Sequence, residues 1–346
     1  MAIGVKVPQD VRIEADTLPR MLNGLQLVVI SICLRNGQRW LYSVSDSGDR
    51  PLTMLERLAR GELLISDGAT GTYLQAHGLE PGGCPEEFNV SHPEVVRSMA
   101  RAYFEAGSDL VLTNSFGANR YMLSKYGHGD RVAEFNRLAA EHARSQAPRD
   151  CYVIGSVGPT GGFLQPLGEI GEAEMLDAFV EQIRALEQGG ADGVVIETMT
   201  AMEESILAIR AAKENTNLAV LATMTFDKGP RGFFTMMGVT PEQAVKGLGD
   251  AGADIVGANC GNGIDVMVEL AGELRKATDG YLLIHSNAGI PSLKKGEILY
   301  PESPEFMAER FKTLADMGIN IIGGCCGTGP DHIKALATPL KSQVKR

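Results

Sequence analysis

The sequence lacks an excess of positive charge. Its formal net charge is −11 at pH 7 over 346 residues. Such an acidic chain repels the phosphates of nucleic acids and of anionic membranes, so neither is an expected partner. A long hydrophobic run is also missing, since the most apolar early stretch, Leu27 to Leu34, is far shorter than the roughly 20 residues of a membrane span. No cationic stretch followed by an A-x-A-like cleavage site marks a signal peptide.

Cysteine is scarce as well. Six cysteines in 346 residues are too few for a disulfide scaffold. We therefore expect a cytoplasmic, reduced protein whose thiolates are free to bind metal. A hydrophobic content of 44% and a charged content of 22% are typical of a soluble globular protein with a sizeable core.

A dinucleotide-binding fingerprint, G-x-G-x-x-G, follows none of the predicted strands. Instead, an apolar strand followed by an amphipathic helix repeats from Leu63 onward. The predicted strands are Leu63–Asp67, Asp109–Asn114, Tyr152–Val157, Gly193–Glu197, Ala219–Thr225, Asp254–Asn259, Tyr281–Ser286 and Ile319–Gly323. The predicted helices are Pro93–Ala106, Arg131–Gln146, Glu172–Gln188, Met202–Glu214, Pro241–Ala251, Asp265–Thr278 and Ser303–Met317. Eight such units favour a closed (β/α)8 TIM barrel, with a doubly wound open sheet as the alternative.

Several of these helices end in a glycine step before the next strand, of the form Gly-x-Asp or Gly-x-Asn. The glycine is the expected C-cap. The first part of the chain reads differently. Leu27–Cys33 and Arg39–Val44 predict two strands paired around the turn Asn36-Gly37. We interpret 1–53 as an N-terminal appendage that need not be well ordered and is dispensable for chemistry, and 54–346 as the barrel.

Three cysteines follow predicted strands. The strand that ends near Gly323 runs into Cys325 and Cys326, and a second strand runs into Cys260. Adjacent cysteines do not bridge easily, but flanking glycines let both thiols reach one ion. Because the carboxyl ends of barrel strands meet at one mouth, the three sulfurs should converge. Three thiolates with one open position are typical of a catalytic zinc site.

Each of these features has a simpler interpretation. A lone Cys260 would more often be a small buried hydrophobic residue. The turn after the vicinal cysteines leads to a helix that Asp331 is expected to cap, and a phosphate site at that helix N-terminus is an alternative.

The other strand ends carry carboxylates, amides and hydroxyls but no lysine or arginine. The candidate substrate-binding residues there are Asp67, Gly68, Asn114, Glu197, Ser286 and Asn287. His285 is the nearby imidazole and is expected within its strand. Asp67 and Glu197 could also be solvated acids or helix caps, and the two asparagines could satisfy turn backbone. A hydrolytic metal site would contain histidine or aspartate clusters, which these strand ends lack.

Three thiolates make zinc a poor activator of water, because they already neutralise its charge. An external thiol in the fourth position would bind as a thiolate at neutral pH and stay nucleophilic. The pattern therefore indicates S-alkylation of a small thiol by in-line displacement. Carboxylates nearby would hold an ammonium group on the same substrate, which fits an amino-acid thiol.

Six motifs together resemble the homocysteine S-methyltransferase family. They are Asp67–Thr72, Leu112–Phe116, Gly193–Thr198, Gly257–Cys260, Ser286–Gly289 and Gly323–Gly327, and the resemblance covers residues 55 to 340. The family includes the homocysteine-binding module of cobalamin-dependent methionine synthase and the betaine– and S-methylmethionine–homocysteine methyltransferases. The resemblance implies a (β/α)8 barrel with Zn²⁺ on the three cysteines. It also implies that Asp67 and Glu197 hold the homocysteine amino group, with Ser286, Asn287 and backbone near Gly68 positioning the carboxylate.

The methyl donor is less defined. Betaine-type members surround the quaternary ammonium with aromatic rings, whereas this chain has Cys84, Gly117 and Thr198 where tryptophan and tyrosine would stand. No corrinoid-binding D-x-H-x-x-G occurs at any of its 6 histidines. We therefore expect homocysteine to be methylated to methionine by a separate methyl-corrinoid protein or by S-methylmethionine. Betaine, another methylated amine or sulfonium donor, a different thiol, or a zinc-stabilised scaffold without activity are the alternatives, and an oligomer is left open.

Overall fold

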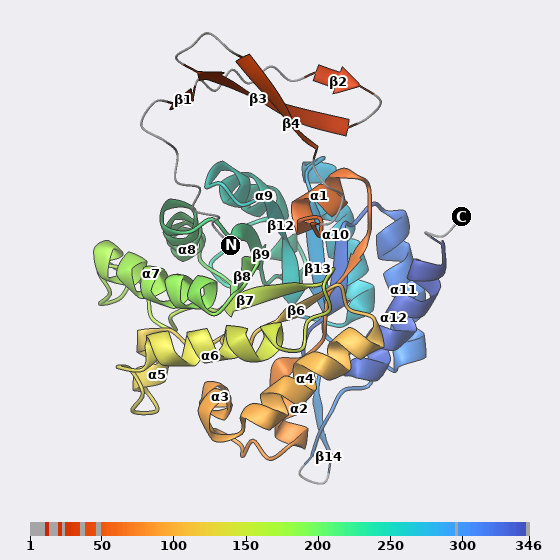
Figure 1. The fold of residues 1–346 in the computed structure, drawn as a ribbon. Coiled ribbons are helices and arrows are strands. Elements are labelled where there is room, and N and C mark those ends of the chain that lie inside the picture. The colour runs from red at the N-terminus through yellow and green to blue at the C-terminus, as the bar shows by residue number, and fades with distance from the viewer. Residues whose placement is uncertain are drawn as a thin grey trace. The chain divides into compact units, whose positions relative to one another are not determined.

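The structure is a computed structural model that describes residues 11–13, 20–22, 25–34, 39–45, 50–294 and 297–343 (Figure 1). The chain divides into two compact units, Met1–Leu52 and Thr53–Arg346. In the first unit β3 (Leu25–Leu34) pairs antiparallel with β4 (Arg39–Ser45), β1 (Val11–Ile13) and β2 (Arg20–Leu22). The predicted strand pair is therefore confirmed, whereas the predicted turn Asn36-Gly37 lies outside the described residues.

Eight strands of the second unit form a nearly closed parallel barrel. Their spatial order is β5, β16, β13, β12, β9, β8, β7, β6. Their bounds are β5 (Leu64–Ile65), β6 (Leu110–Leu112), β7 (Tyr152–Val157), β8 (Gly193–Met199), β9 (Ala219–Met224), β12 (Ile255–Cys260), β13 (Leu282–Ser286) and β16 (Ile321–Gly324). Each matches a predicted strand, and the TIM barrel is confirmed. No helix in the described part of the chain has the length and apolar character to cross a bilayer.

Helices surround the barrel (Figure 1). The main ones are α4 (Pro93–Ala106), α6 (Val132–Arg144), α7 (Glu172–Gln188), α8 (Met202–Asn215), α9 (Pro241–Asp250), α10 (Ile264–Ala277), α11 (Pro304–Asp316) and α12 (Pro330–Gln343). Shorter elements are α1 (Met54–Ala59), α2 (Thr70–Ala76), the 3-10 turn η1 (Pro85–Glu87), α3 (Phe88–Ser91), α5 (Arg120–Ser124) and the hairpins β10 (Asp227–Gly229)–β11 (Gly232–Phe234) and β14 (Ser292–Lys294)–β15 (Glu297–Leu299). The prediction that Asp331 caps a helix is wrong, because α12 starts at Pro330 and includes Asp331 in its first turn.

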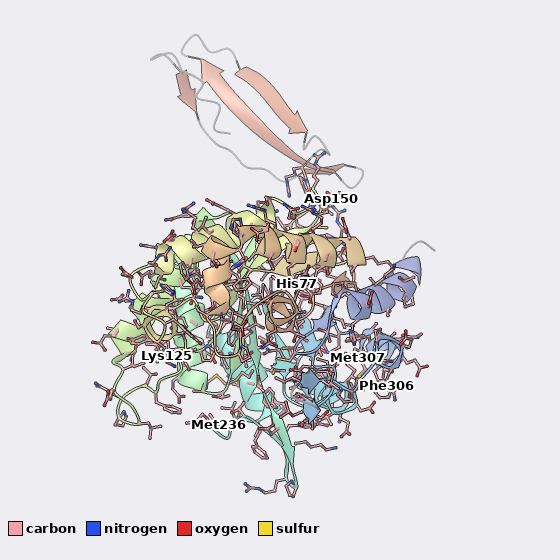
Figure 2. All side chains as sticks on the ribbon, turned by 90° about the horizontal axis from the view of Figure 1, so that it is seen from below. His77, Lys125, Asp150, Met236, Phe306 and Met307 are labelled. Atoms are coloured by element: carbon pink, nitrogen blue, oxygen red, sulfur yellow. The ribbon has the colours of Figure 1, made fainter. Side chains whose placement is uncertain are left out.

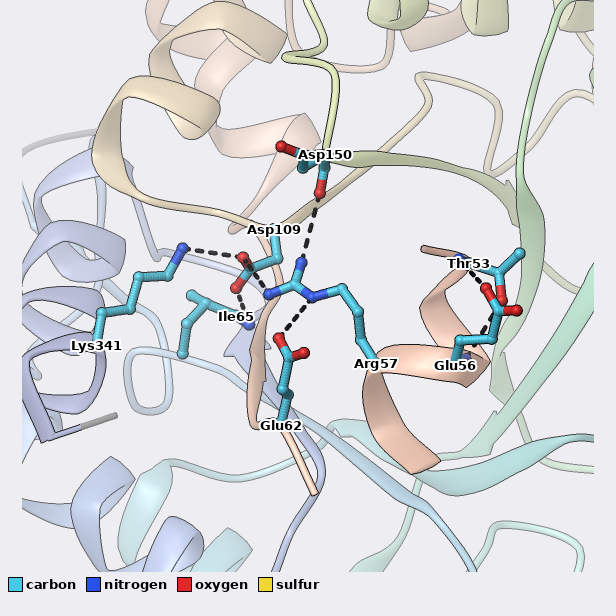
Figure 3. A network of polar contacts seen from close by, with 8 residues as sticks. All are labelled: Thr53, Glu56, Arg57, Glu62, Ile65, Asp109, Asp150 and Lys341. Atoms are coloured by element: carbon cyan, nitrogen blue, oxygen red, sulfur yellow. Dashed lines mark hydrogen bonds and ion pairs between the residues drawn. The ribbon is translucent and has the colours of Figure 1, made fainter. Parts of the chain in front are cut away.

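The inside of the barrel is filled at the end where the strands begin. Met54 and Leu58 of α1 pack there against inward residues of the strands, among them Leu64, Leu110 and Leu283. Helix α1 starts at a capping box, in which Thr53 and Glu56 exchange side-chain and backbone hydrogen bonds (Figure 3). This packing leaves the opposite end, where the strands finish, available for a site.

The Gly-x-Asp steps form hydrogen-bonded clamps between alternate pairs of strands. In each step the backbone N–H of the Asp or Asn donates to the carbonyl of one residue on the neighbouring strand. The side-chain oxygen of the same Asp or Asn accepts the backbone N–H of that strand residue. The four pairs are Asp109 with Ile65, Asp192 with Val153, Asp254 with Val220, and Asn320 with Leu282. The glycine two residues earlier ends the preceding helix with a positive φ, for example 109° at Gly107. The repeated sequence step thus fixes the spacing of the strands as well as ending the helices.

Candidate metal and substrate site

Three thiols meet where β12 and β16 end. Cys260 is the last residue of β12 and has a φ of 64°, an uncommon conformation for a residue with a side chain. Cys325 and Cys326 directly follow β16. The three Sγ atoms lie within 4.8 Å of one another, the one such cluster of His, Cys, Asp or Glu in the described part of the chain. Zn–S bonds of about 2.3 Å place the sulfurs of a tetrahedral site about 3.8 Å apart, so a zinc ion fits this cluster.

Hydrogen bonds polarise the three thiols. Contacts from Cys325 and then Cys326 lower the pKa of Cys260, and the contact with Cys260 raises the pKa of Cys325. Asn287 Nδ2 also donates to Cys260 Sγ at 3.6 Å, and Asn287 Oδ1 is buried with no partner. Three sulfurs that can be deprotonated form a donor set suited to a soft divalent cation such as zinc.

A cavity of about 370 Å³ opens beside the thiols. The predicted residues that line it are Gly68, Asn114, Glu197, Cys260, Cys325 and Cys326. Asp67, Ser286 and Asn287 are buried but are not among its lining residues. Asp150, which precedes β7, and Met236, which follows the β10–β11 hairpin, lie on opposite sides of this unit (Figure 2).

Two buried carboxylates belong to this region. Ser156 Oγ donates to Glu197, and burial raises the pKa of Glu197 to about 7. Asp67 accepts the backbone N–H of Leu112 at 2.7 Å. Burial raises the pKa of Asp67 to about 7, that hydrogen bond lowers it, and the charge of Glu197 raises it further. Two acids that repel each other in a buried place favour a cation between them.

The remaining predicted residues have protein partners. Asn114 Nδ2 donates to the carbonyl of Pro85 at 2.7 Å, and Ser286 Oγ donates to the carbonyl of Asn287 at 3.1 Å. Cys325 N–H donates to the carbonyl of Ser286 at 2.7 Å. These contacts hold the strand-end turns in place, so that the thiols and the cavity keep their positions.

Sequence reasoning missed Glu86. This side chain is 4% exposed and lines the cavity. It accepts the N–H of Gly117 at 2.6 Å and the thiol of Cys84 at 3.5 Å, and burial raises its pKa. Glu86 lies in η1, a loop element, whereas the sequence predicts site residues only at the ends of strands. His285 was placed in its strand by the sequence, and the structure shows in addition that it lines the cavity.

The family model "Homocysteine S-methyltransferase" matches residues 64–340. The chain belongs to this family. The methionine synthase of Mycobacterium tuberculosis is 33% identical over 304 residues, which cover 82% of this chain and 25% of the relative. That of Mycobacterium leprae is 33% identical over 307 residues, covering 83% and 25%. The chain thus spans about a quarter of the length of these relatives.

Solved structures agree on the fold. The metallated form of the homocysteine methyltransferase MmuM from Escherichia coli superposes with a TM-score of 0.68 at 20% identity, covering 82% of this chain and 98% of that one. A methyltransferase from Methanosarcina mazei gives a TM-score of 0.54 at 10% identity, covering 85% and 99%. At these identities the likeness supports the barrel architecture alone.

Proposed function

We propose that this family member methylates the thiol of homocysteine to give methionine, with Zn²⁺ held by Cys260, Cys325 and Cys326. The observation that carries this proposal is the meeting of three Sγ atoms within 4.8 Å at the wall of a cavity that Glu197 also lines. A zinc ion there would lower the pKa of a substrate thiol, so that the thiol reacts as a thiolate near neutral pH.

The protein's own residues bind and orient the amino acid. Asp67 and Glu197 take its ammonium group, whose positive charge relieves the repulsion between the two buried acids. Ser286, Asn287 and the backbone near Gly68 hold its carboxylate, and Asn114 fixes the loop at Pro85, which lines the cavity. The substrate sulfur then attacks the methyl carbon of the donor in line, forming the S–C bond as the donor's bond to the methyl group breaks.

The donor is a methyl-corrinoid carried by a separate protein or domain, with S-methylmethionine as the second candidate. The similarity to methionine synthases about four times as long as the matched region supports a donor delivered by another module. Among the described lining residues Phe116 is the one phenylalanine, and tyrosine and tryptophan do not occur. A betaine cage needs several rings around the cation, so betaine is disfavoured.

We also propose a cytoplasmic location. Cys84, Cys151 and the three site cysteines all carry free thiols. A reducing compartment keeps such thiols available to a metal.

A donor panel tests the proposed function. Purified protein loaded with zinc is incubated with homocysteine and, separately, a methyl-corrinoid protein, S-methylmethionine or betaine, and methionine is measured. We expect methionine with one of the first two donors. Cys325→Ser should abolish it, whereas Cys151→Ser, at a half-buried cysteine outside the cluster, should not. Methionine from none of the donors would refute the activity, and turnover with betaine would refute the donor assignment.

A further inference from the structure

A belt of polar side chains lies inside the barrel above its hydrophobic filling. Ser156 on β7 donates to Glu197 on β8, and Asn259 Nδ2 on β12 donates to the other oxygen of Glu197 at 3.4 Å. The next position along this level is His285 on β13, whose register partners are Asn259 and Gly323. Because paired residues of neighbouring strands point to the same face, His285 shares the interior with Asn259. It lines the cavity with the three cysteines.

His285 has an unused hydrogen-bonding atom. The residue is 1% exposed, and its Nε2 is buried with no hydrogen-bond partner. Buried polar atoms of side chains nearly always have a partner, so an exception inside a substrate cavity points to a ligand. Asn259, its neighbour at the same level, is in contrast bonded through both amide atoms, to Thr198 and Thr223 among others.

The ring lies close to the turn after β5, where Ser66 and Asp67 stand. A Cβ added at Gly323 would lie 3.1 Å from His285 Cδ2 and 2.6 Å from the Cβ of Ser66. The same point would lie 2.9 Å from the carbonyl oxygen of Asp67. Since Cδ2 is bonded to Nε2 in the ring, this edge of the ring faces β16 and the turn after β5, in the wall of the cavity that Glu197 also lines.

An ammonium group has three N–H donors, and the two carboxylates offer partners for two of them. Burial lowers the pKa of His285 to about 4, so the ring is neutral near pH 7 and one nitrogen can accept. A neutral acceptor adds a hydrogen bond without adding to the repulsion between Asp67 and Glu197. This is the chemistry that the third N–H of a buried ammonium requires.

We propose that His285 is a substrate-binding residue whose Nε2 accepts a hydrogen bond from the amino group of the amino-acid thiol. This inference rests on the proposed function and adds a third contact to its amino-group site. It makes His285 a determinant of specificity, because a thiol without an amino group gains nothing from the contact.

The test compares two variants and two thiols on the zinc-loaded protein. Homocysteine is set against 4-mercaptobutanoate, which keeps the thiol and the carboxylate but lacks the amino group. For His285→Leu we expect KM for homocysteine to rise about 10- to 100-fold with kcat little changed, and calorimetric binding to weaken by the same factor. His285→Gln, whose amide oxygen can accept in place of Nε2, should recover most of the loss. Binding of 4-mercaptobutanoate should be equal in all three proteins.

Two controls separate this role from a general effect of removing a buried histidine. His142 is also buried, and its Nε2 already bonds to the carbonyl of Asn89 at 2.9 Å. His142→Leu should therefore lower the melting temperature and leave KM unchanged. If His285→Leu does not fold, His285→Phe keeps the ring shape and removes the acceptor.

Equal homocysteine affinity in wild type and the folded apolar variant would overturn the proposal. An equal loss of affinity for both thiols would also overturn it, since it would indicate a packing role. Failure of the proposed function looks different, because the wild-type protein itself would then bind no homocysteine.

Discussion

Asp109 offers a stringent test of the clamps between strands. Its buried carboxylate accepts the N–H of Ile65 at 2.9 Å, Arg57 Nη2 at 3.2 Å and Lys341 Nζ at 3.0 Å (Figure 3). It thereby ties α1, β5, β6 and α12 together at the end of the barrel opposite the thiols. Asp109→Ala removes every one of these contacts. Asp109→Asn keeps an oxygen for the N–H of Ile65, as Asn320 does at the equivalent clamp.

The unfolding free energy lost with each contact of Asp109 depends on how buried the partner group is. The N–H of Ile65, left buried and unpaired in the alanine variant, costs about 1–3 kcal/mol. The Arg57 side chain is 17% exposed, so losing its carboxylate adds about 1–2 kcal/mol, whereas Lys341, 44% exposed, adds less than about 1 kcal/mol. We expect Asp109→Ala to cost about 3–5 kcal/mol and Asp109→Asn about 1–2 kcal/mol. At about 2 °C per kcal/mol for a domain of this size, the melting temperature falls by about 6–10 °C and about 2–4 °C.

Urea unfolding at low and high salt measures the free energy of unfolding of the two variants and of wild type. The asparagine variant loses mainly charge interactions, so its loss of unfolding free energy relative to wild type should be smaller at high salt. The alanine variant also leaves the N–H of Ile65 unpaired, so most of its additional loss of unfolding free energy should remain at high salt. Zinc content should be unchanged in both variants, since Asp109 lies at the far end of the strands from the cysteines. An alanine variant no less stable than the asparagine variant would refute the clamp argument.

Four other outcomes are expected. Cys325→Ser should lose zinc and turnover but melt within a few degrees of wild type, as measured by metal analysis and calorimetry. Because burial raises the pKa of Glu197 to about 7 from 4.5, its contribution to stability is present below pH 4.5 and is lost as pH rises through 7. Glu197→Gln should therefore gain stability relative to wild type over that range, by at most about 1.4 kcal/mol per pH unit in urea titrations. A chain that starts at Thr53 should keep its turnover, whereas one that starts at Met54 should lose about 1 kcal/mol of unfolding free energy with the helix cap. Asp67→Asn should raise KM for homocysteine at least about tenfold, because it removes the charge, and its melting temperature near pH 7 should not fall, because it keeps an acceptor for Leu112 and the pKa of Asp67 is raised like that of Glu197.

The barrel could be predicted because strand and helix periodicities alternate clearly along the sequence. Helices α4 and α7 begin and end where the pattern places them. The Gly-x-Asp steps were recognised only as helix ends. Their aspartates act on a neighbouring strand, as Asp254 does on Val220, and sequence spacing carries no information about such a partner. The hairpin β10–β11 was missed because both of its strands have only three residues.

The thiol cluster could be predicted because each cysteine directly follows an apolar strand, and parallel strands bring their ends together. Glu86 reaches the cavity from η1, and nothing in a loop sequence tells how far it folds back over a barrel mouth. The ring of His285 packs against Gly323, its register partner on β16, a relation between two strands that sequence spacing does not reveal.

Strand β5 shows why the site and the barrel cannot be considered separately. It was predicted to run to Asp67 but covers only Leu64–Ile65. Beyond it, the carboxylate of Asp67, and not a backbone carbonyl, accepts the N–H of Leu112 on β6. A proposed substrate-binding group thus also bridges the seam where the barrel closes. Closure explains why Asp67 is only 1% exposed, and this burial raises its pKa because the carboxylate has no positive charge beside it, which a substrate ammonium would supply.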